Sequence, residues 1–136
     1  LLKKYIKLNG SDEVIDRSSD FIAGDLGKFK NHRLTIIGRS KEIIIRGGVN
    51  ISPKYIEEQL ANSKIHEIAV IGIPDEISGE RIICFYSAKD DMNSELRSIS
   101  KSKLSSIFRP EKFIRLDSFP KTGSGKIIKN KLQSLY

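Results

Sequence analysis

The stretch Phe119-Pro-Lys-Thr-Gly-Ser-Gly-Lys126 is the most tightly constrained part of this sequence. Pro120 has a fixed φ angle and disfavours helix at the residue before it, while Gly123 and Gly125 tolerate left-handed φ angles and close backbone approach. The stretch therefore predicts a tight, exposed loop that carries the ammonium group of Lys126 outward. Such a loop suits a phosphate or carboxylate, because it offers a point charge together with backbone N–H groups.

We call this segment the lysine loop. Its sequence suggests two other interpretations. A solvated surface turn is the common meaning of a Gly-Ser-Gly-Lys sequence taken alone, and it stays open. A nucleotide-binding P-loop is excluded, because that motif needs glycine where Pro120 stands and serine or threonine where Ile127 stands.

The composition is that of one small globular domain, or of a small domain with part of another. The chain has 136 residues, of which 38% are hydrophobic and 30% charged, which is enough for one modest core. No apolar run approaches the ~18 residues of a membrane span, and the first residues lack the regions of a signal peptide. The single cysteine, Cys84, lies in an apolar run and is predicted to be a buried, inert thiol. We therefore expect a protein of the reducing cytoplasm.

Positive charge is concentrated at the C-terminal end. Residues 1–100 contain 15 basic and 15 acidic side chains, so the whole excess of +7 lies in residues 101–136. A positive end that includes Lys126 attracts anionic ligands. A basic interaction module for nucleic acid or an acidic partner is the competing hypothesis, but the phenylalanines here alternate with isoleucine and leucine, which favours a core over base stacking. We expect no nucleic acid, and no metal site, since His32 and His66 stand far apart.

Local patterns predict an α+β domain. Two hairpins are expected, one around residues 31–33 and one with Gly47-Gly48 as its turn. Two apolar strands, residues 65–73 and 81–88, are predicted to pair antiparallel with helices over at least part of both faces. Further elements are a helix from the Ser52 cap through Pro53 to about Ala61, one from Asn93 or Ser94 through Ile107 that Pro110 stops, a strand at 113–116, and a last helix with Ile128, Leu132 and Leu135 on one face.

Two polar segments in the first third of the chain suggest a ligand contact and a hinge. Asp25 has Gly24 before it and Gly27 soon after, which places its carboxylate on a turn. That carboxylate either accepts from vicinal hydroxyls, such as those of a ribose, or satisfies its own backbone in an Asx turn. Residues 38–42 are short and polar between two apolar runs, which indicates a hinge. The Gly47-Gly48 turn serves either tight geometry or close approach of a ligand.

Three separated stretches together resemble the C-terminal signatures of the adenylate-forming ligases, which include acyl-CoA synthetases, peptide-synthetase adenylation domains and luciferases. They are Phe-x-x-Gly-Asp at 21–25, Gly-Arg-x-x-Glu with Gly-Gly-x-Asn-Ile-x-Pro at 38–53, and Pro-Lys-Thr-x-x-Gly-Lys at 120–126. Their order and spacing match, and the similarity covers about residues 20–136. Asn50-Ile51-Ser52-Pro53 is more similar to the acyl-CoA synthetase branch than to the peptide-synthetase branch.

The resemblance implies a role for each matching residue in an acid–thiol ligase that forms an acyl-adenylate and then a thioester. The catalytic residue would be Lys126, bridging the substrate carboxylate and the α-phosphate of ATP. The remaining roles are Asp25 at the ribose hydroxyls, Arg39 at the ribose and phosphate, Lys41 at the hinge, and Gly47 and Gly48 along the channel for the pantetheine thiol of CoA.

The resemblance also implies how the chain is divided. Residues 1–38 would be the terminal stretch of a large N-terminal domain, residues 39–41 the hinge, and residues 42–136 a mobile C-terminal domain with a central sheet, flanking helices and a hairpin. The large domain, with its phosphate loop and acyl pocket, is missing, so we expect this chain to be inactive alone. Its partners would be that domain, a carboxylic acid, ATP with Mg²⁺ held by the large domain, and CoA. A carrier-protein thiol is the alternative acceptor.

Two positions depart from the family pattern. Ala23 stands where threonine is usual before Gly-Asp, so a hydroxyl near the nucleotide is not available from this position. Tyr55 stands where glutamate is common, a change that we assign to packing.

Overall fold

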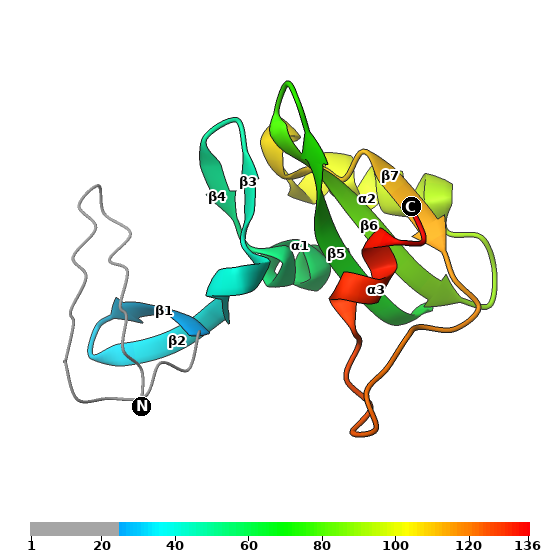
Figure 1. Ribbon diagram of the computed structural model, residues 1–136, viewed down its shortest axis with the longest axis horizontal. Helices are drawn as coiled ribbons and strands as arrows, with labels where there is room; N and C mark the ends of the chain where they lie inside the picture. The colour runs from blue at the N-terminus through cyan, green and yellow to red at the C-terminus, as the bar shows by residue number, and fades with distance from the viewer. Residues whose placement is uncertain (1–24) are drawn as a thin grey trace. The chain divides into compact units, whose positions relative to one another are not determined.

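The chain divides into two compact units, Leu1–Ile43 and Ile44–Tyr136. The computed structural model describes residues 25–136 (Figure 1). Phe21 to Gly24, which begin the first family motif and include Ala23, lie outside the described residues. The longest helix within 25–136 has 11 residues, and none of the helices described there is long and apolar enough to cross a membrane.

The described part of the first unit is an antiparallel hairpin followed by a short 3₁₀ turn. Strand β1 (Asp25–Lys30) pairs with β2 (Arg33–Arg39), and η1 (Ser40–Glu42) follows. Asn31 and His32 form the connection with φ angles of 50° and 59°, the left-handed conformation that two-residue hairpin turns require. The hairpin predicted around residues 31–33 is therefore confirmed.

The second unit is built on a five-stranded mixed sheet. The strand order is β4-β3-β6-β5, and β7 pairs with β6 in parallel. The α+β class, with a central sheet, flanking helices and a hairpin, is confirmed. The elements are β3 (Ile44–Arg46), β4 (Val49–Ile51), α1 (Pro53–Leu60), β5 (Ile65–Asp75), β6 (Gly79–Ala88), α2 (Asn93–Lys103), η2 (Ser106–Phe108), β7 (Lys112–Arg115) and α3 (Lys129–Gln133).

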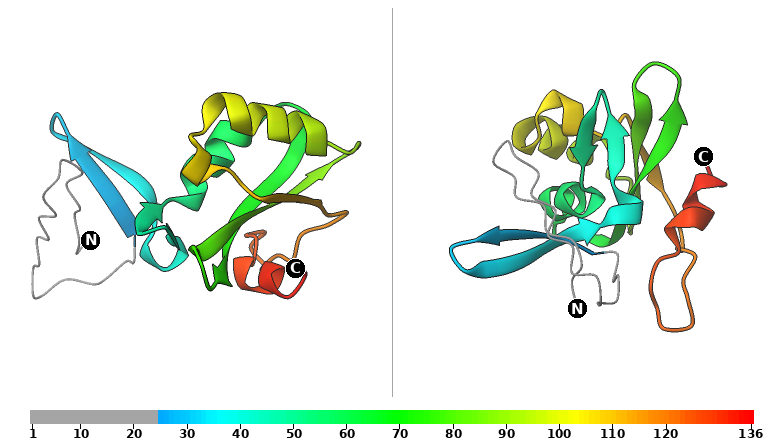
Figure 2. Two further views of the ribbon diagram at one scale, coloured as in Figure 1. Left: turned by 90° about the horizontal axis from the view of Figure 1, so that it is seen from above. Right: turned by 60° about the vertical axis from the view of Figure 1, so that its left-hand side comes forward.

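Helices cover both faces of this sheet, as the continuous apolar strands predict. Figure 2 shows α1 and α2 on one face and α3 on the other. Side chains of β6 alternate between the two cores: Cys84 and Tyr86 pack with α1 and α2, whereas Ile83 and Phe85 pack with Leu132 of α3. Fully burying one such side chain contributes about 1.5–3 kcal/mol, so the two cores hold the unit together.

The burial of two phenylalanines and of the single cysteine confirms that these side chains belong to the core. Phe113 and Phe119 are buried rather than displayed for base stacking. Cys84 is a buried free thiol, as predicted, and burial raises its pKa well above the usual range.

Helix α1 begins where the sequence predicts. The Ser52 hydroxyl accepts a hydrogen bond from the Tyr55 N–H at 3.4 Å, and Pro53 occupies the first helical position. Ile56 and Leu60 are fully buried. The ring of Tyr55 packs edge-on against Phe108 with centroids 5.8 Å apart, which agrees with a packing role for this departure from the family pattern.

The predicted limits of the helix after residue 92 are wrong at both ends. Helix α2 starts after Met92, and neither Asn93 nor Ser94 caps it; instead the Asp91 carboxylate accepts from the Asn93 N–H at 3.0 Å. The helix ends at Lys103, well before Pro110, because the next residue is extended, and Ile107 lies in η2. Arg109 stabilises the end by donating to the Lys101 and Leu104 carbonyl oxygens at 3.2 and 2.9 Å.

The last helix is also shorter than its periodicity predicts. Helix α3 has five residues; Ile128 is its N-cap and Leu132 is fully buried. Leu135 lies beyond the helix and is 54% exposed, because the helix ends before a further turn brings that position to the sheet.

Candidate functional site

The lysine loop is closed at its base by backbone hydrogen bonds. Lys121 and Ile127 form an isolated antiparallel bridge, and the Thr122 N–H donates to the Lys126 carbonyl oxygen at 2.8 Å. The Gly125 N–H donates to the Thr122 carbonyl at 2.9 Å, with φ +85° at Gly125. Residues 121–126 are all exposed. The prediction of a tight, exposed loop is confirmed, and the left-handed residue explains one of its glycines.

A threonine side chain organises the loop around its lysine. The Thr122 hydroxyl oxygen accepts from the Lys126 N–H at 3.1 Å and lies 2.9 Å from the Ser124 hydroxyl oxygen. These contacts order the backbone of Lys126 while its side chain remains exposed. The loop therefore presents the lysine from a defined base.

Lys126 differs from the lysines on either side of it. Lys121 forms an ion pair with Glu67, and Lys129 forms one with Glu57 at 2.8 Å. The Lys126 ammonium has no hydrogen bond or ion pair to any residue in the described range 25–136. An exposed cation held this way is available to an external anion, since no carboxylate of the described part of the chain pairs with it.

The second feature is the turn of the β3–β4 hairpin, formed by Gly47 and Gly48 and called here the Gly-Gly turn. Gly47 and Gly48 have φ angles of +55° and +76°, so tight left-handed geometry is one reason for both glycines. A Cβ atom at Gly48 would meet nothing within 4 Å, and one at Gly47 would meet only Ile107 Cδ1, at 3.7 Å. The turn is therefore open as well as strained for other residues. Tight geometry is confirmed as one reason for the glycines, and close approach of a ligand stays a prediction.

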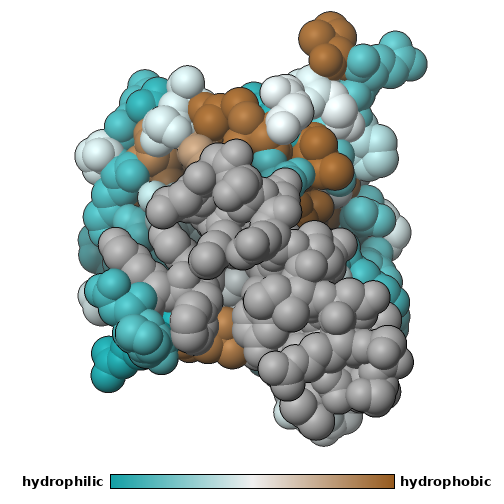
Figure 3. Space-filling model, turned by 90° about the vertical axis from the view of Figure 1, so that its left-hand side faces the viewer, coloured by the Kyte–Doolittle hydropathy of each residue, from teal (hydrophilic) through white to brown (hydrophobic). Residues whose placement is uncertain are grey.

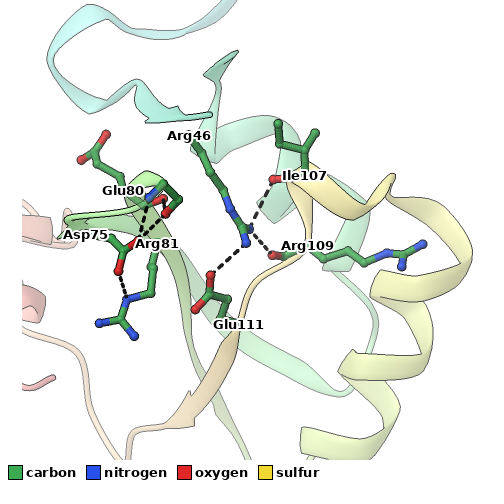
Figure 4. Close-up of polar contacts among 8 residues, drawn as sticks. Arg46, Asp75, Glu80, Arg81, Ile107, Arg109 and Glu111 are labelled. Carbon is green, nitrogen blue, oxygen red and sulfur yellow. Dashed lines mark hydrogen bonds and ion pairs between the residues drawn. The ribbon is translucent and has the colours of Figure 1, made fainter. Parts of the chain in front are cut away.

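Side-chain contacts tie this hairpin to segments far away in the sequence (Figure 4). The Arg46 guanidinium donates to the carbonyl oxygens of Ile107 and Arg109 and pairs with Glu111. On the other side, a Glu80 carboxylate oxygen accepts from the Ile45 N–H at 2.6 Å. Sequence reasoning missed these residues, because partners 35 to 65 positions apart leave no local pattern.

The β5–β6 turn lies against the Gly-Gly turn. The Gly47 N–H donates to the Ser78 carbonyl oxygen at 2.8 Å, and Gly79 lies so close that a Cβ there would be 2.9 Å from the Ile45 carbonyl oxygen. Asp75 closes the β5–β6 turn. Hydrogen bonds from the Ser78 hydroxyl and N–H hold the pKa of Asp75 below its usual range.

Hydrophobic side chains are exposed around these two turns. Ile45 is 52% exposed, Val49 37% and Ile77 97%. In Figure 3, brown hydrophobic surface lies at the top of the view, the height at which Figure 1 draws the tips of the two hairpins. The region around the Gly-Gly turn thus combines open backbone with apolar surface, a combination that suits contact with another body.

The lysine loop and the Gly-Gly turn lie at opposite ends of the second unit. In Figure 1 the orange loop before α3 extends downward, whereas the β3–β4 turn is at the top. One unit therefore carries the exposed Lys126 at one end and an open glycine turn at the other. The two cannot reach the same point in turn unless the unit rotates.

The remaining predicted residues belong to the first unit. Asp25 is the first residue of strand β1 and pairs in register with Arg39 of β2. The prediction that Asp25 stands on a turn is therefore wrong. Gly27 serves close packing in the strand rather than a turn, since a Cβ there would lie 2.7 Å from Leu34 Cδ1. Lys41 is exposed within η1, two residues before the boundary between the two units.

Comparison with known proteins identifies similar sequences. Residues 56–126 match the model of the AMP-binding enzyme C-terminal domain. The chain is 33% identical, over 90% of its length, to the medium-chain acyl-CoA ligase ACSF2, mitochondrial, of Homo sapiens, and 39% identical, over 99% of its length, to the probable acyl-activating enzyme 10 of Arabidopsis thaliana. It covers only 21% and 27% of those two proteins.

A solved structure has the same fold and a related sequence. It is the O-succinylbenzoate coenzyme A synthetase (MenE) of Bacillus subtilis in complex with ATP and a magnesium ion. The TM-score is 0.78 and the identity 29%, covering 86% of this chain and 25% of that one. The chain thus spans about a quarter of the length of the proteins that it matches.

Proposed function

The chain belongs to the AMP-binding enzyme family as a C-terminal domain, and from this premise we propose that it serves both half-reactions of an acid–thiol ligase. In the first, a carboxylic acid and ATP form an acyl-adenylate and pyrophosphate. In the second, a thiol converts the acyl-adenylate to a thioester and AMP. The thiol we assign is that of CoA, because the relatives of similar sequence are named as acyl-CoA ligases or acyl-activating enzymes.

One observation carries the proposal: Lys126, whose ammonium has no partner among residues 25–136, and the open Gly47-Gly48 turn stand at opposite ends of one unit (Figure 1). The two half-reactions have opposite needs. The first needs a cation between two anions, and the second needs a passage for a thiol. A domain that rotates can supply each in turn to the same reacting group.

Lys126 is proposed to act in the first half-reaction. A carboxylate oxygen attacks the α-phosphorus and the bond to pyrophosphate breaks, so two negatively charged groups must approach each other. An ammonium placed beforehand between them offsets that repulsion and stabilises the transition state. Asp25 and Arg39, which pair in register across β1 and β2, are proposed to hold the ribose hydroxyls and phosphate of the nucleotide.

The Gly47-Gly48 turn is proposed to act in the second half-reaction. The thiol sulfur attacks the acyl carbonyl, the bond to AMP breaks, and the thiol proton leaves to solvent or a base. The attacked centre is a neutral carbonyl rather than a negatively charged phosphate, so this step lacks the repulsion that the cation offsets in the first step. The thiol step needs room, and a turn without side chains leaves room for the pantetheine arm of CoA.

The remaining parts of the reaction are assigned to a large N-terminal domain. We place the Mg²⁺ that accompanies ATP in that domain, as the resemblance to the adenylate-forming ligases implies. Residues 1–38 are proposed to end it, residues 39–41 to form the hinge at Lys41, and residues 42–136 to be the mobile domain. The chain alone is then inactive. We also propose that the ligase acts in the cytoplasm.

The test separates the two half-reactions in the full-length ligase that contains this chain. With octanoate as the probe acid, acid-dependent ATP–pyrophosphate exchange reports the first step, and conversion of supplied octanoyl-adenylate with CoA reports the second. We expect Lys126→Ala to lower exchange about a hundredfold or more and to spare thioester formation. Equal loss of both steps would contradict the assignment. Lys131→Ala, which removes an exposed lysine of α3, is the control for loss of charge.

For the Gly-Gly turn the expected result is the opposite: the thiol step is slowed and pyrophosphate exchange is kept. Gly48→Phe adds bulk, whereas Gly48→Ala carries the same left-handed strain with a small side chain. We expect Gly48→Phe to slow the CoA step far more than Gly48→Ala does, and to leave exchange intact. A carrier-protein thiol is the alternative acceptor, and it is favoured if the wild-type ligase makes octanoyl-adenylate but no octanoyl-CoA.

A further inference from the structure

The β3–β4 hairpin is attached to the sheet by very little backbone. Each strand has three residues, and the pairing between them is three residues long. Only one residue pair, Arg46 with Gly79, joins β3 to β6. A two-stranded hairpin of this size is marginal in water, so side-chain contacts must determine where its turn stands.

Arg46 supplies the most extensive of these contacts. Its Nη1 donates to the carbonyl oxygens of Arg109 at 3.1 Å and of Ile107 at 3.4 Å, and its Nη2 donates to Glu111 Oε1 at 2.8 Å. Ile107 lies in η2, whereas Arg109 and Glu111 lie on the connection from η2 to β7. The Arg46 side chain is only 19% exposed. Figure 4 shows the guanidinium reaching between the hairpin and this connection.

Arg46 immediately precedes Gly47, so its side chain anchors the residue from which the turn starts. Beyond this anchor the turn has few constraints: the Gly47 N–H donates to Ser78, and Gly48 has no neighbour for a Cβ within 4 Å. Loss of the anchor leaves two glycines free to sample many conformations, since glycine has the largest backbone freedom of any residue.

We propose that Arg46 is a positioning residue for the thiol half-reaction, because it holds the Gly47-Gly48 turn against the η2–β7 connection. The inference rests on the proposed function of that turn. Arg46 touches neither substrate; it acts through the position of the backbone that follows it. The first half-reaction does not depend on Arg46, because the lysine loop lies at the other end of the unit (Figure 1).

An arginine is required for this geometry. Its planar guanidinium directs several N–H groups in fixed directions and can donate to the two carbonyls and the carboxylate at once, whereas a lysine ammonium is a compact charge on a flexible stem. Arg46→Lys therefore keeps the ion pair with Glu111 and loses the carbonyl contacts. We expect it to fall between the wild type and Arg46→Met.

Arg115 provides a matched control. Its Nε and Nη2 donate to the carbonyl oxygens of Ala88 and Lys89 at 3.0 and 2.8 Å. It thus makes the same kind of arginine-to-carbonyl contact at the other end of β6, since Gly79 beside the hairpin begins this strand and Ala88 ends it. Arg115→Met makes the same chemical change at an exposed position and does not touch the hairpin.

The experiment uses the full-length ligase with octanoate, ATP and CoA. For Arg46→Met we expect kcat/KM for CoA to fall about tenfold to a hundredfold, with ATP–pyrophosphate exchange within about twofold of the wild type. Arg46→Lys gives an intermediate loss, and Arg115→Met gives no selective loss of the CoA step. If Arg46→Met does not fold, Arg46→Lys is used instead. The quantity compared is again the loss of kcat/KM for CoA relative to the loss of ATP–pyrophosphate exchange.

Two results overturn the inference. One is an equal loss of exchange and of the CoA step in Arg46→Lys, which indicates a general structural role. The other is an unchanged kcat/KM for CoA in both Arg46 variants. Failure of the proposed function is distinguishable from either, because Gly48→Phe would then leave the CoA step intact. If Gly48→Phe slows that step and the Arg46 variants do not, only the inference about Arg46 fails.

Discussion

The Glu57 carboxylate lies 2.8 Å from the Lys129 ammonium, and the same carboxylate oxygen accepts a hydrogen bond from the Val70 N–H at 2.8 Å. Glu57 belongs to α1 on one face of the sheet and Lys129 to α3 on the other (Figure 2). Their contact therefore crosses the edge of the sheet at β5. Both side chains are about four-fifths buried, at 19% and 21% exposure, so solvent screens the pair only in part.

We expect Glu57→Ala to lower the free energy of unfolding by about 1–3 kcal/mol, because it leaves a backbone N–H of β5 without its acceptor. Glu57→Gln is expected to cost less, since an amide oxygen can still accept from Val70. Urea unfolding of the chain measures both. The control is Glu95→Ala, which breaks the exposed Lys64–Glu95 pair and is expected to change stability by less than about 1 kcal/mol. Equal effects of Glu57→Ala and Glu95→Ala would refute the prediction.

A second prediction concerns the hydroxyl of Thr122, which accepts from the Lys126 N–H. Thr122→Val keeps the shape of the side chain and removes this acceptor, so the loop samples more conformations and presents Lys126 less often. We expect acid-dependent pyrophosphate exchange to fall up to about tenfold, the equivalent of one hydrogen bond. Thr122→Ser retains the hydroxyl and serves as the rescue variant. Equal rates for Val and Ser variants would show that the hydroxyl is dispensable.

The third prediction tests the hinge. Lys41 lies in the η1 turn just before the boundary at Ile43. Proline fixes φ near −65° and removes an N–H group, so Lys41→Pro is expected to restrict rotation and to slow overall thioester formation more than pyrophosphate exchange. Lys41→Ala removes the charge and keeps the backbone free, which separates the two effects. Normal turnover of Lys41→Pro would argue against a pivot at this residue.

The fourth prediction concerns acid stability. Hydrogen bonds from the Tyr86 hydroxyl at 2.7 Å and from the Asn93 N–H hold the pKa of Asp91 below its usual range. Since the folded chain binds this proton less tightly than the unfolded chain does, the stabilisation is complete above the unfolded pKa, about 4. It is lost as the pH falls through the lower folded pKa.

The measurement is the free energy of unfolding of the wild type and of Asp91→Asn across acidic pH. The variant lacks the titrating group, so its stability is expected to depend less on pH below about 4 than that of the wild type. Parallel curves for the two proteins would show that Asp91 does not carry this dependence. Asp90→Asn, at the exposed neighbouring position, is the matched control.

Sequence reasoning predicted the local elements well, because their signals are contained in a few adjacent residues. The glycine pair at 47 and 48 sets a left-handed turn, the Ser52-Pro53 pair starts α1, and the apolar run from Arg81 to Ala88 forms the central strand β6. The lysine loop was likewise predictable, since proline and glycine restrict or free their own φ angles whatever surrounds them.

The same reasoning failed where hydrogen bonds, rather than the period of apolar residues, determine where an element begins. The start of α2 depends on Asp91, which accepts from the Asn93 N–H and the Tyr86 hydroxyl. The strand position of Asp25 depends on Arg39, which becomes its neighbour only when β1 and β2 pair. A periodic pattern of apolar residues contains neither contact.

What the sequence by itself determined is the family and the types of the elements, since these follow from residue identity and spacing; the residues that would carry the chemistry stay a prediction. Only the tertiary structure decided that Lys126 has no partner among residues 25–136 while Lys121 and Lys129 are paired. It also decided that Arg46, directly before the Gly-Gly turn, pairs with Glu111, which lies 65 residues away in the sequence. The physical reason is that charge pairing and strand attachment depend on distance in space, which a linear sequence does not specify.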